Sequence, residues 1–121
     1  MARNLTQLIR STFMSAAEAL QEAGWRPSTD VYRTPEGWLI KLELAGVRPE
    51  DVRATVAGRH LCVQGIRRDR RLEEGCYCYR LEIAYSRFQR DIELPAELDA
   101  SHVYTEFRDG MLLIRLRSAI R

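Results

Sequence analysis

The sequence predicts an all-β protein, an antiparallel β-sandwich preceded by one short N-terminal helix. Three observations lead to this prediction. After Pro27 the apolar runs alternate with polar residues, which is the period of a strand with one buried face. Turn residues interrupt these runs at short intervals. The helical period of about 3.6 is confined to the residues before Gly24. Seven or eight short strands of this kind are typical of an immunoglobulin-like sandwich.

Size and composition indicate a single globular domain without a strong charge. The chain has 121 residues, of which 45% are hydrophobic and 30% are charged. A net charge of +2 does not require a nucleic-acid partner. No apolar run approaches the roughly 18 residues that span a membrane, so we expect no membrane partner. Three cysteines without a secretory signal argue against a disulfide framework, and we expect a cytoplasmic location.

Residues 1–25 are predicted to form an amphipathic helical arm. Apolar residues recur there at steps of three and four, with Asn4 as a plausible N-cap and Gly24 as the helix stop. The main members of this stripe are Leu5, Leu8, Ile9 and Phe13. Such a short helix is marginal in water by itself. It therefore packs on its own domain, on another copy of the chain or on another protein, and the sequence leaves these three alternatives open.

Four strands are predicted in the first half of the domain. Strands 30–33 and 38–44 flank a Thr-Pro-Glu-Gly turn. An elbow, Gly-Val-Arg-Pro-Glu-Asp, then breaks the alternation. Strands 52–56 and 60–64 lie on either side of an Ala-Gly-Arg turn, and both alternate apolar with polar residues. We expect these last two strands to pair as an antiparallel hairpin.

The second half contains a long connection and three more strands. A charged block and a β-rich stretch, residues 76–83, lie between residues 66 and 87, and a connection this long is usually functional or structured. The stretch has no obvious partner strand in the sequence. Strand 88–94 ends at Pro95. Strands 103–107 and 111–116 flank Asp-Gly, a strong hairpin signal.

Four ordered stretches carry a resemblance to a known family. They are DVYRTPEGWLIKLELAGVRPEDVRATVAG, RHLCVQGIRR, RFQRDIELP and TEFRDGMLLIRL. The first contains the elbow, the third resembles a Phe-x-Arg-x-apolar-x-Leu-Pro strand end, and the last resembles an Ala-x-x-x-Asn-Gly-Val-Leu hallmark. Together they resemble the α-crystallin domain of the small heat-shock proteins (the Hsp20 family), in its bacterial form. The resemblance implies an α-crystallin domain at 26–117, the arm at 1–25 and a short stub at 118–121.

The chain departs from the family pattern at several positions. Thr105 replaces the hallmark Ala, Asp109 replaces Asn and Met111 replaces Val. The family's C-terminal Ile-x-Ile/Val anchor is not matched, because Ile120 is the one large apolar residue in 118–121. The resemblance therefore does not predict the number of subunits in an oligomer.

The resemblance implies an ATP-independent holdase, which binds partly unfolded client proteins and prevents their aggregation. By the family pattern, a client groove lies between strands 52–56 and 103–107. The residues expected to line it are Val52, Ala54, Val56, Val103 and Thr105. The alternative is that these residues are simply part of the core, and for Phe107 the core interpretation is preferred. The arm residues Leu5, Leu8, Ile9 and Phe13 would form a second surface for clients or assembly.

The resemblance also implies a homodimer, and allows larger oligomers, because the long connection carries a strand that is exchanged with the partner subunit. The residues expected on that strand are Tyr77, Tyr79, Leu81 and Ile83, together with Cys76 and Cys78. The alternative is a loop that packs on its own chain. An exchanged strand would supply the sheet neighbour that 76–83 lacks.

Other functions are less well supported by the sequence. The pair Cys76-x-Cys78 does not have the usual Cys-x₂-Cys zinc spacing, and we expect no metal. Redox sensing by these two cysteines stays open. No nucleophile has a base beside it by motif, so we expect neither an enzyme nor a cofactor. The block Arg67–Arg71 lacks interleaved aromatics and is interpreted as a solvated loop. The main competing function is a p23-like co-chaperone, a related sandwich that binds one folded chaperone.

Overall fold

A computed structural model describes residues 24–69 and 73–119. This part of the chain contains seven strands and one short 3₁₀-helix, η1. In order, they are β1 (Thr29–Arg33), β2 (Gly37–Glu43), η1 (Pro49–Asp51), β3 (Val52–Ala57), β4 (His60–Ile66), β5 (Arg87–Glu93), β6 (Leu98–Arg108) and β7 (Met111–Ser118). The predicted N-terminal helix lies outside the described residues.

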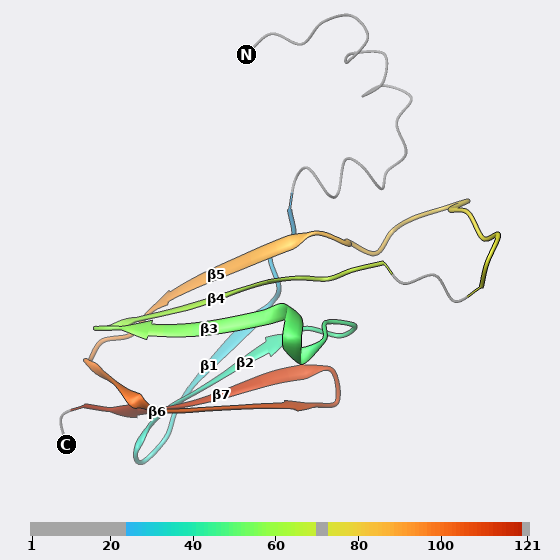
Figure 1. Cartoon of the computed structure of the whole chain (residues 1–121). Helices are drawn as coiled ribbons and strands as arrows, with labels where there is room; N and C mark the ends of the chain where they lie inside the picture. Colours follow the sequence, from blue (N-terminus) through green and yellow to red (C-terminus); the bar gives the residue numbers. More distant parts are fainter. Residues whose placement is uncertain (1–23, 70–72, 120–121) are drawn as a thin grey trace, which may run out of the picture.

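The strands form two antiparallel layers, as the sequence predicts (Figure 1). One sheet has the order β1-β2-β7-β6 and the other has the order β3-β4-β5. The strands at the sheet borders are β1 and β6 in the first sheet and β3 and β5 in the second. Among these, β3 at the border of one sheet neighbours β6 at the border of the other. The two layers thus bring together the strands from which the sequence predicts a groove.

Two turns show why particular residues are required. At the β6–β7 hairpin, Asp109 and Gly110 have φ angles of 52° and 78°, and these left-handed conformations are the ones that a two-residue hairpin turn needs. The predicted Asp-Gly hairpin is therefore confirmed. At the start of β2, a Cβ on Gly37 would lie 2.2 Å from the Leu116 carbonyl oxygen. Only glycine lets β2 approach β7 this closely.

The core lies between the two layers. The apolar residues that alternate along β2 and β7 point inward and meet those of β4 and β5. The buried members are Ile40, Leu42, Leu44, Val47, Leu61, Val63, Phe88, Ile92, Leu94, Leu98, Leu112, Ile114 and Leu116. Burying each of the larger side chains contributes about 1.5–3 kcal/mol before the entropy of folding is subtracted. The period-2 pattern of the sequence thus identifies the buried face of these strands correctly.

One segment differs from the sequence prediction. Strand β6 begins at Leu98, five residues before the predicted start at Val103, and its register with β7 shifts between these two residues. The prediction missed the first part because Asp-Ala-Ser-His is a poor strand sequence. Residues 76–83 form no strand with the described part of their own chain, and their exchange with a partner subunit stays a prediction. Their β-rich composition has no ladder to join, since no other described strand lies beside them.

Candidate functional site

Two border strands, β3 and β6, form the candidate site. Strand β3 pairs with β4 on one side, and β6 pairs with β7. No strand of the described residues pairs with the other side of either one. A border strand presents unpaired backbone N–H and C=O groups, which can pair with an additional extended chain. We call the line along which β3 and β6 neighbour each other the β3/β6 seam.

The predicted groove residues line this seam with unequal exposure. Val52, Ala54 and Val56 alternate along β3 as half-buried residues with exposed Arg53 and Thr55 between them. The three half-buried residues pack against the core, and so do Val103 and Phe107 of β6. Thr105, between the last two, is exposed. The seam thus has a row of partly covered apolar side chains next to free strand edges.

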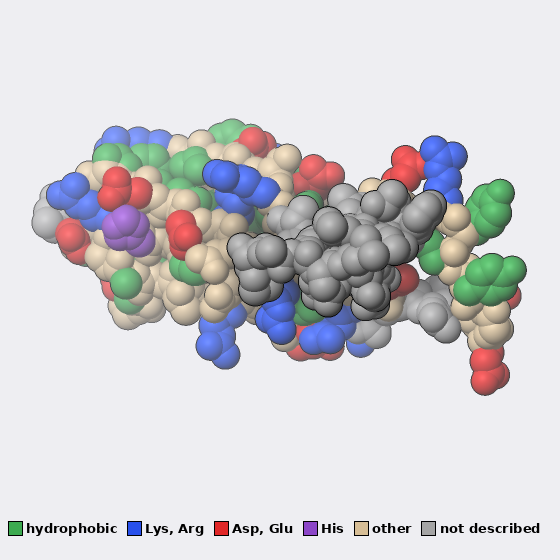
Figure 2. All heavy atoms as spheres, turned by 90° about the horizontal axis from the view of Figure 1, so that it is seen from above, with side chains coloured by type: hydrophobic (Ala, Val, Ile, Leu, Met, Phe, Trp, Pro, Cys, Tyr) green, Lys and Arg blue, Asp and Glu red, His purple; other side chains and the backbone are tan. Residues whose placement is uncertain are grey.

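Residues 73–83, in the long connection between β4 and β5, stand away from the sandwich (Figure 1). Tyr77 and Tyr79 are 84% and 97% exposed, and Ile83 is 55% exposed. Figure 2 shows green hydrophobic side chains on this protruding segment, which are open to solvent. Leu81 is half-buried. Exposed apolar side chains that gather in a patch often mark a surface that another chain covers.

Arg67 fixes the base of this loop to the domain. Its Nε donates to the Ala84 carbonyl oxygen (2.7 Å), and Nη1 donates to the Ala45 carbonyl oxygen (3.2 Å). The guanidinium carbon also lies 3.7 Å from the centroid of the Trp25 ring. Burial lowers the pKa of Arg67 from its ordinary value. One side chain therefore joins the loop, the elbow after β2 and the segment that leads into the domain.

Strand β1 supplies another exposed border. It pairs with β2 on one side, and no described strand lies on the other. Val31 and Tyr32 are 44% and 45% exposed. The Lys41 ammonium lies 5.4 Å from the centroid of the Tyr32 ring. A partly apolar strand edge of this kind can accept a further strand.

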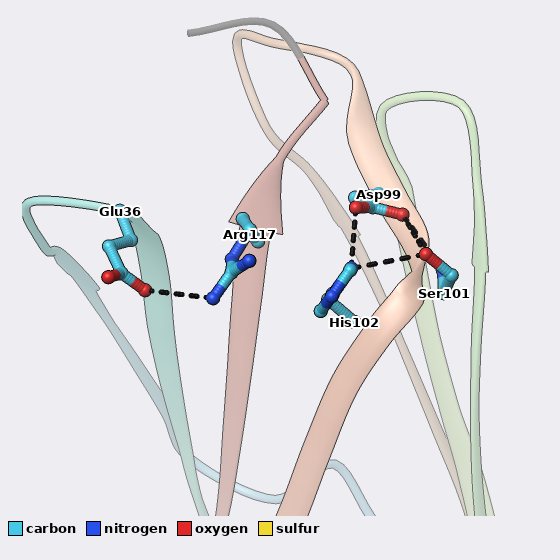
Figure 3. Close-up of polar contacts among 5 residues, drawn as sticks. All are labelled: Glu36, Asp99, Ser101, His102 and Arg117. Atoms are coloured by element: carbon cyan, nitrogen blue, oxygen red, sulfur yellow. Dashed lines mark hydrogen bonds and ion pairs between the residues drawn. The ribbon is translucent and has the colours of Figure 1, made fainter.

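A polar cluster occupies the irregular part of β6 (Figure 3). Asp99 accepts hydrogen bonds from the backbone N–H of Ser101 (3.0 Å) and from its hydroxyl (2.5 Å). The other Asp99 oxygen lies 2.7 Å from His102 Nδ1. The hydrogen bonds from Ser101, with a smaller contribution from His102, lower the pKa of Asp99 to about 2. The cluster holds the chain where the register of β6 shifts.

This cluster has the residue types of a catalytic triad but not its geometry. In a triad, the serine and the carboxylate contact opposite nitrogens of the histidine. Here the Ser101 hydroxyl (3.1 Å) and Asp99 both approach the same nitrogen, Nδ1 of His102. The histidine cannot pass a proton from Ser101 along that path. The strand pattern of the sequence did not mark this cluster, although Asp side chains commonly bond the backbone two residues further on.

The cysteines fall into two environments. Cys62 lies on β4 and is half-buried, and burial followed by its hydrogen bond to Asp91 raises its pKa. Cys76 and Cys78 are exposed on the loop, and all three are free thiols. Among residues 24–69 and 73–119, no group of three or more His, Cys, Asp or Glu side chains is arranged to hold a metal ion. The same residues include no helix long and apolar enough to cross a bilayer.

The comparisons with known sequences and folds agree with one another. The model described as HSP20, the Hsp20/alpha crystallin family, matches residues 30–120. The chain is 30% identical over 90 residues to spore protein SP21 of Stigmatella aurantiaca, covering 74% of this chain and 53% of that protein. It is 28% identical over 90 residues to small heat shock protein C2 of Rickettsia felis, covering 74% and 58%. The chain thus spans just over half the length of these two relatives.

Solved structures show the same architecture. Heat shock protein 16.0 from Schizosaccharomyces pombe superposes with a TM-score of 0.70 at 28% identity, covering 79% of this chain and 89% of that one. The hspA protein from Xanthomonas axonopodis superposes with a TM-score of 0.68 at 25% identity, covering 79% and 96%. The sequence matches and the structural superpositions therefore indicate the same fold.

Proposed function

Because the chain belongs to the Hsp20/alpha crystallin family, we propose that it is an ATP-independent holdase chaperone that binds partly unfolded clients at the β3/β6 seam. The observation that carries the proposal is that two strand edges without a described partner lie beside a row of half-buried apolar side chains. A partly unfolded protein exposes both apolar side chains and unpaired backbone groups. The seam offers a complement to each of them.

The seam is better suited to this role than the other borders of the sheets. A client strand added to β3 or β6 would gain backbone hydrogen bonds, and its alternate side chains would cover Val52, Ala54, Val56 or Val103. Strand β5 also borders its sheet, but Trp25 bridges to Phe88 there and their rings are 5.2 Å apart. Strand β1 lies at the border of its sheet opposite β6, so it is available for self-association while the seam binds a client.

The proposed activity can be tested with a heat-labile model client and no nucleotide. We expect a molar excess of this protein to delay the rise in light scattering as the client is heated. Bovine albumin at the same mass concentration is the control for nonspecific protection. Equal rates of aggregation with and without the protein would refute the holdase proposal, and protection that requires ATP would refute its nucleotide independence.

For self-association, we propose that residues 76–83 add as a strand to the β1 border of a second copy. The exposed residues Tyr77, Tyr79 and Ile83, with half-buried Leu81, share one face of an extended chain. Docking would cover them together with Val31 and Tyr32 of the partner surface. Static light scattering at micromolar concentration should give at least a dimer. Replacing Leu81 and Ile83 by serine should lower the native mass, whereas Arg80→Ser on the opposite face should not.

The arm residues Leu5, Leu8, Ile9 and Phe13 remain a predicted second surface for clients or assembly, and they lie outside the described residues. Deleting residues 1–24 should reduce client protection or native mass. If client protection and native mass both stay unchanged, the arm has neither role. The p23-like co-chaperone alternative is not favoured, because the family match is to Hsp20 proteins and one superposed structure is heat shock protein 16.0.

A further inference from the structure

The loop that carries the proposed exchange strand also carries two exposed thiols one residue apart. Cys76 and Cys78 are free and open to solvent. A turn precedes them, in which Gly75 has a φ of 85° and the Cys76 N–H approaches the Glu73 carbonyl oxygen at 3.4 Å. No ladder within the described chain holds this segment. Strand pairing therefore does not fix the backbone of this segment in either an extended or a bent conformation.

Extended and disulfide-bonded forms of this segment require different backbone lengths. In a strand each residue advances about 3.4 Å, so residues i and i+2 have Cα atoms about 6.8 Å apart on one face. A disulfide prefers a Cα separation of about 5.5–6 Å, and about 6.8 Å is its outer limit. A disulfide also needs Cβ atoms about 3.5–4.5 Å apart, much closer than two same-face positions of a strand, so closing a bond between Cys76 and Cys78 contracts and bends the chain at Tyr77. That bend removes the first residues of the stretch from strand pairing.

We propose that Cys76 and Cys78 form a reversible disulfide within the loop, and that this bond opposes docking of residues 76–83 on a second copy. The second part rests on the proposed strand exchange. The oxidant is hydrogen peroxide: one thiolate attacks a peroxide oxygen, which gives a sulfenic acid and releases hydroxide as the O–O bond breaks. The other thiol then displaces the sulfenic hydroxyl, so the S–S bond forms and water leaves. A dithiol reductant reverses the reaction by thiol–disulfide exchange.

Docking and oxidation are linked in both directions. If the disulfide weakens docking, docking must make the thiols harder to oxidise by the same factor, because the two equilibria share one cycle. Peroxide would thereby lower the fraction of chains that are docked on a second copy. Cys62 provides an internal comparison, since it is half-buried on β4 and burial raises its pKa. A protonated thiol reacts slowly, so Cys76 and Cys78 should oxidise first.

The covalent step can be read directly by mass spectrometry. Trypsin cuts after Arg71 and after Arg80, which leaves both loop cysteines in one peptide of residues 72–80. After treatment of the full chain with hydrogen peroxide and alkylation, this peptide should be about 2 Da lighter than the reduced, unalkylated peptide and carry no label. Dithiothreitol should restore two labels. Disulfides between chains on a nonreducing gel, or two sulfinic acids in place of the bond, would overturn the proposal.

The effect on assembly is measured by light scattering over a dilution series. Oxidised protein should require about tenfold more chain than reduced protein to reach half-dimer, and Cys76→Ser/Cys78→Ser protein should not respond to peroxide. The Cys62→Ser variant should respond as the wild type does. A disulfide that forms without shifting the dilution curve of a reduced dimer would overturn the coupling. Reduced protein that stays monomeric would instead refute the strand exchange, while the peptide mass still tests the disulfide.

Discussion

At the scale of single residues, Arg67 is the side chain on which the position of the loop depends most. Its charged hydrogen bonds end on two backbone carbonyl groups from different segments, and its plane covers Trp25. Lysine keeps the charge but has neither the flat surface for stacking nor the forked donors. A lysine at this position therefore cannot make all three contacts of Arg67.

We predict that Arg67→Lys destabilises the domain by about 1–3 kcal/mol, the usual cost of losing charged hydrogen bonds and leaving acceptors unpaired. Urea unfolding followed by tryptophan fluorescence measures the change, and Trp25 emission should shift to the red in the folded variant. Arg68→Lys is the matched control, because Arg68 is exposed and pairs with Asp51 at 3.2 Å. Equal midpoints for the two variants would contradict the role assigned to Arg67.

The cluster at Asp99 predicts a dependence of stability on pH. The ordinary pKa of aspartate is about 3.9, whereas hydrogen bonds hold that of Asp99 at about 2 in the folded protein. A lowered carboxylate pKa contributes stability that is fully present above about pH 4 and is lost as the pH falls through about 2. Between pH 5 and pH 2.5, the urea midpoint of Asp99→Asn should therefore fall less than that of the wild type. Parallel declines would show that the cluster does not stabilise β6.

At the scale of elements, strand β3 allows the seam to be separated from the rest of the surface. Its half-buried and exposed residues alternate, so neighbouring positions test the two faces of one strand. We predict that Val56→Asp lowers protection of a heated client at least several-fold, because a charge next to the apolar row disfavours binding of apolar segments. Thr55→Asp adds the same charge on the exposed face and should protect like the wild type.

This comparison requires that both variants stay folded, which far-UV circular dichroism and a urea midpoint establish. Val56 packs against the core, so its replacement also costs stability. Val56→Thr is the milder version: it keeps the shape of the side chain and should give an intermediate loss. Full protection by folded Val56→Asp would remove the seam as the client site.

The strands also show which features can be predicted from a sequence. Strands with one buried face, such as β2 and β7, are marked by alternation, and their turns by Asp-Gly and Thr-Pro-Glu-Gly. The start of β6 could not be predicted, because Asp99, Ser101 and His102 hold it through local side-chain bonds instead of strand propensity. Residues 76–83 have strand composition without a strand, since no described strand of this chain lies beside them to pair with. Exposure at Thr105 depends on how the two layers overlap, which no local pattern encodes.

At the scale of the whole molecule, the two-layer arrangement lets a small domain bury its core and still expose strand edges with unpaired backbone groups. The buried residues lie between the sheets, while β3 and β6 remain at adjacent borders. Figure 1 shows residues 73–83 of the connection between β4 and β5 projecting past one end of this sandwich. Client capture and self-association would therefore use different borders, so one need not block the other.

The most direct test of the account is amide hydrogen exchange during heating with an excess of unfolding client, read by mass spectrometry of peptides from each strand. We predict that exchange slows in β3 and β6, because an added client strand would pair with their free backbone groups. Exchange in β5, the other border of the three-stranded sheet, should stay as it is without client. If the client remains soluble while exchange in β3 and β6 is unchanged, the proposed capture at the seam is wrong.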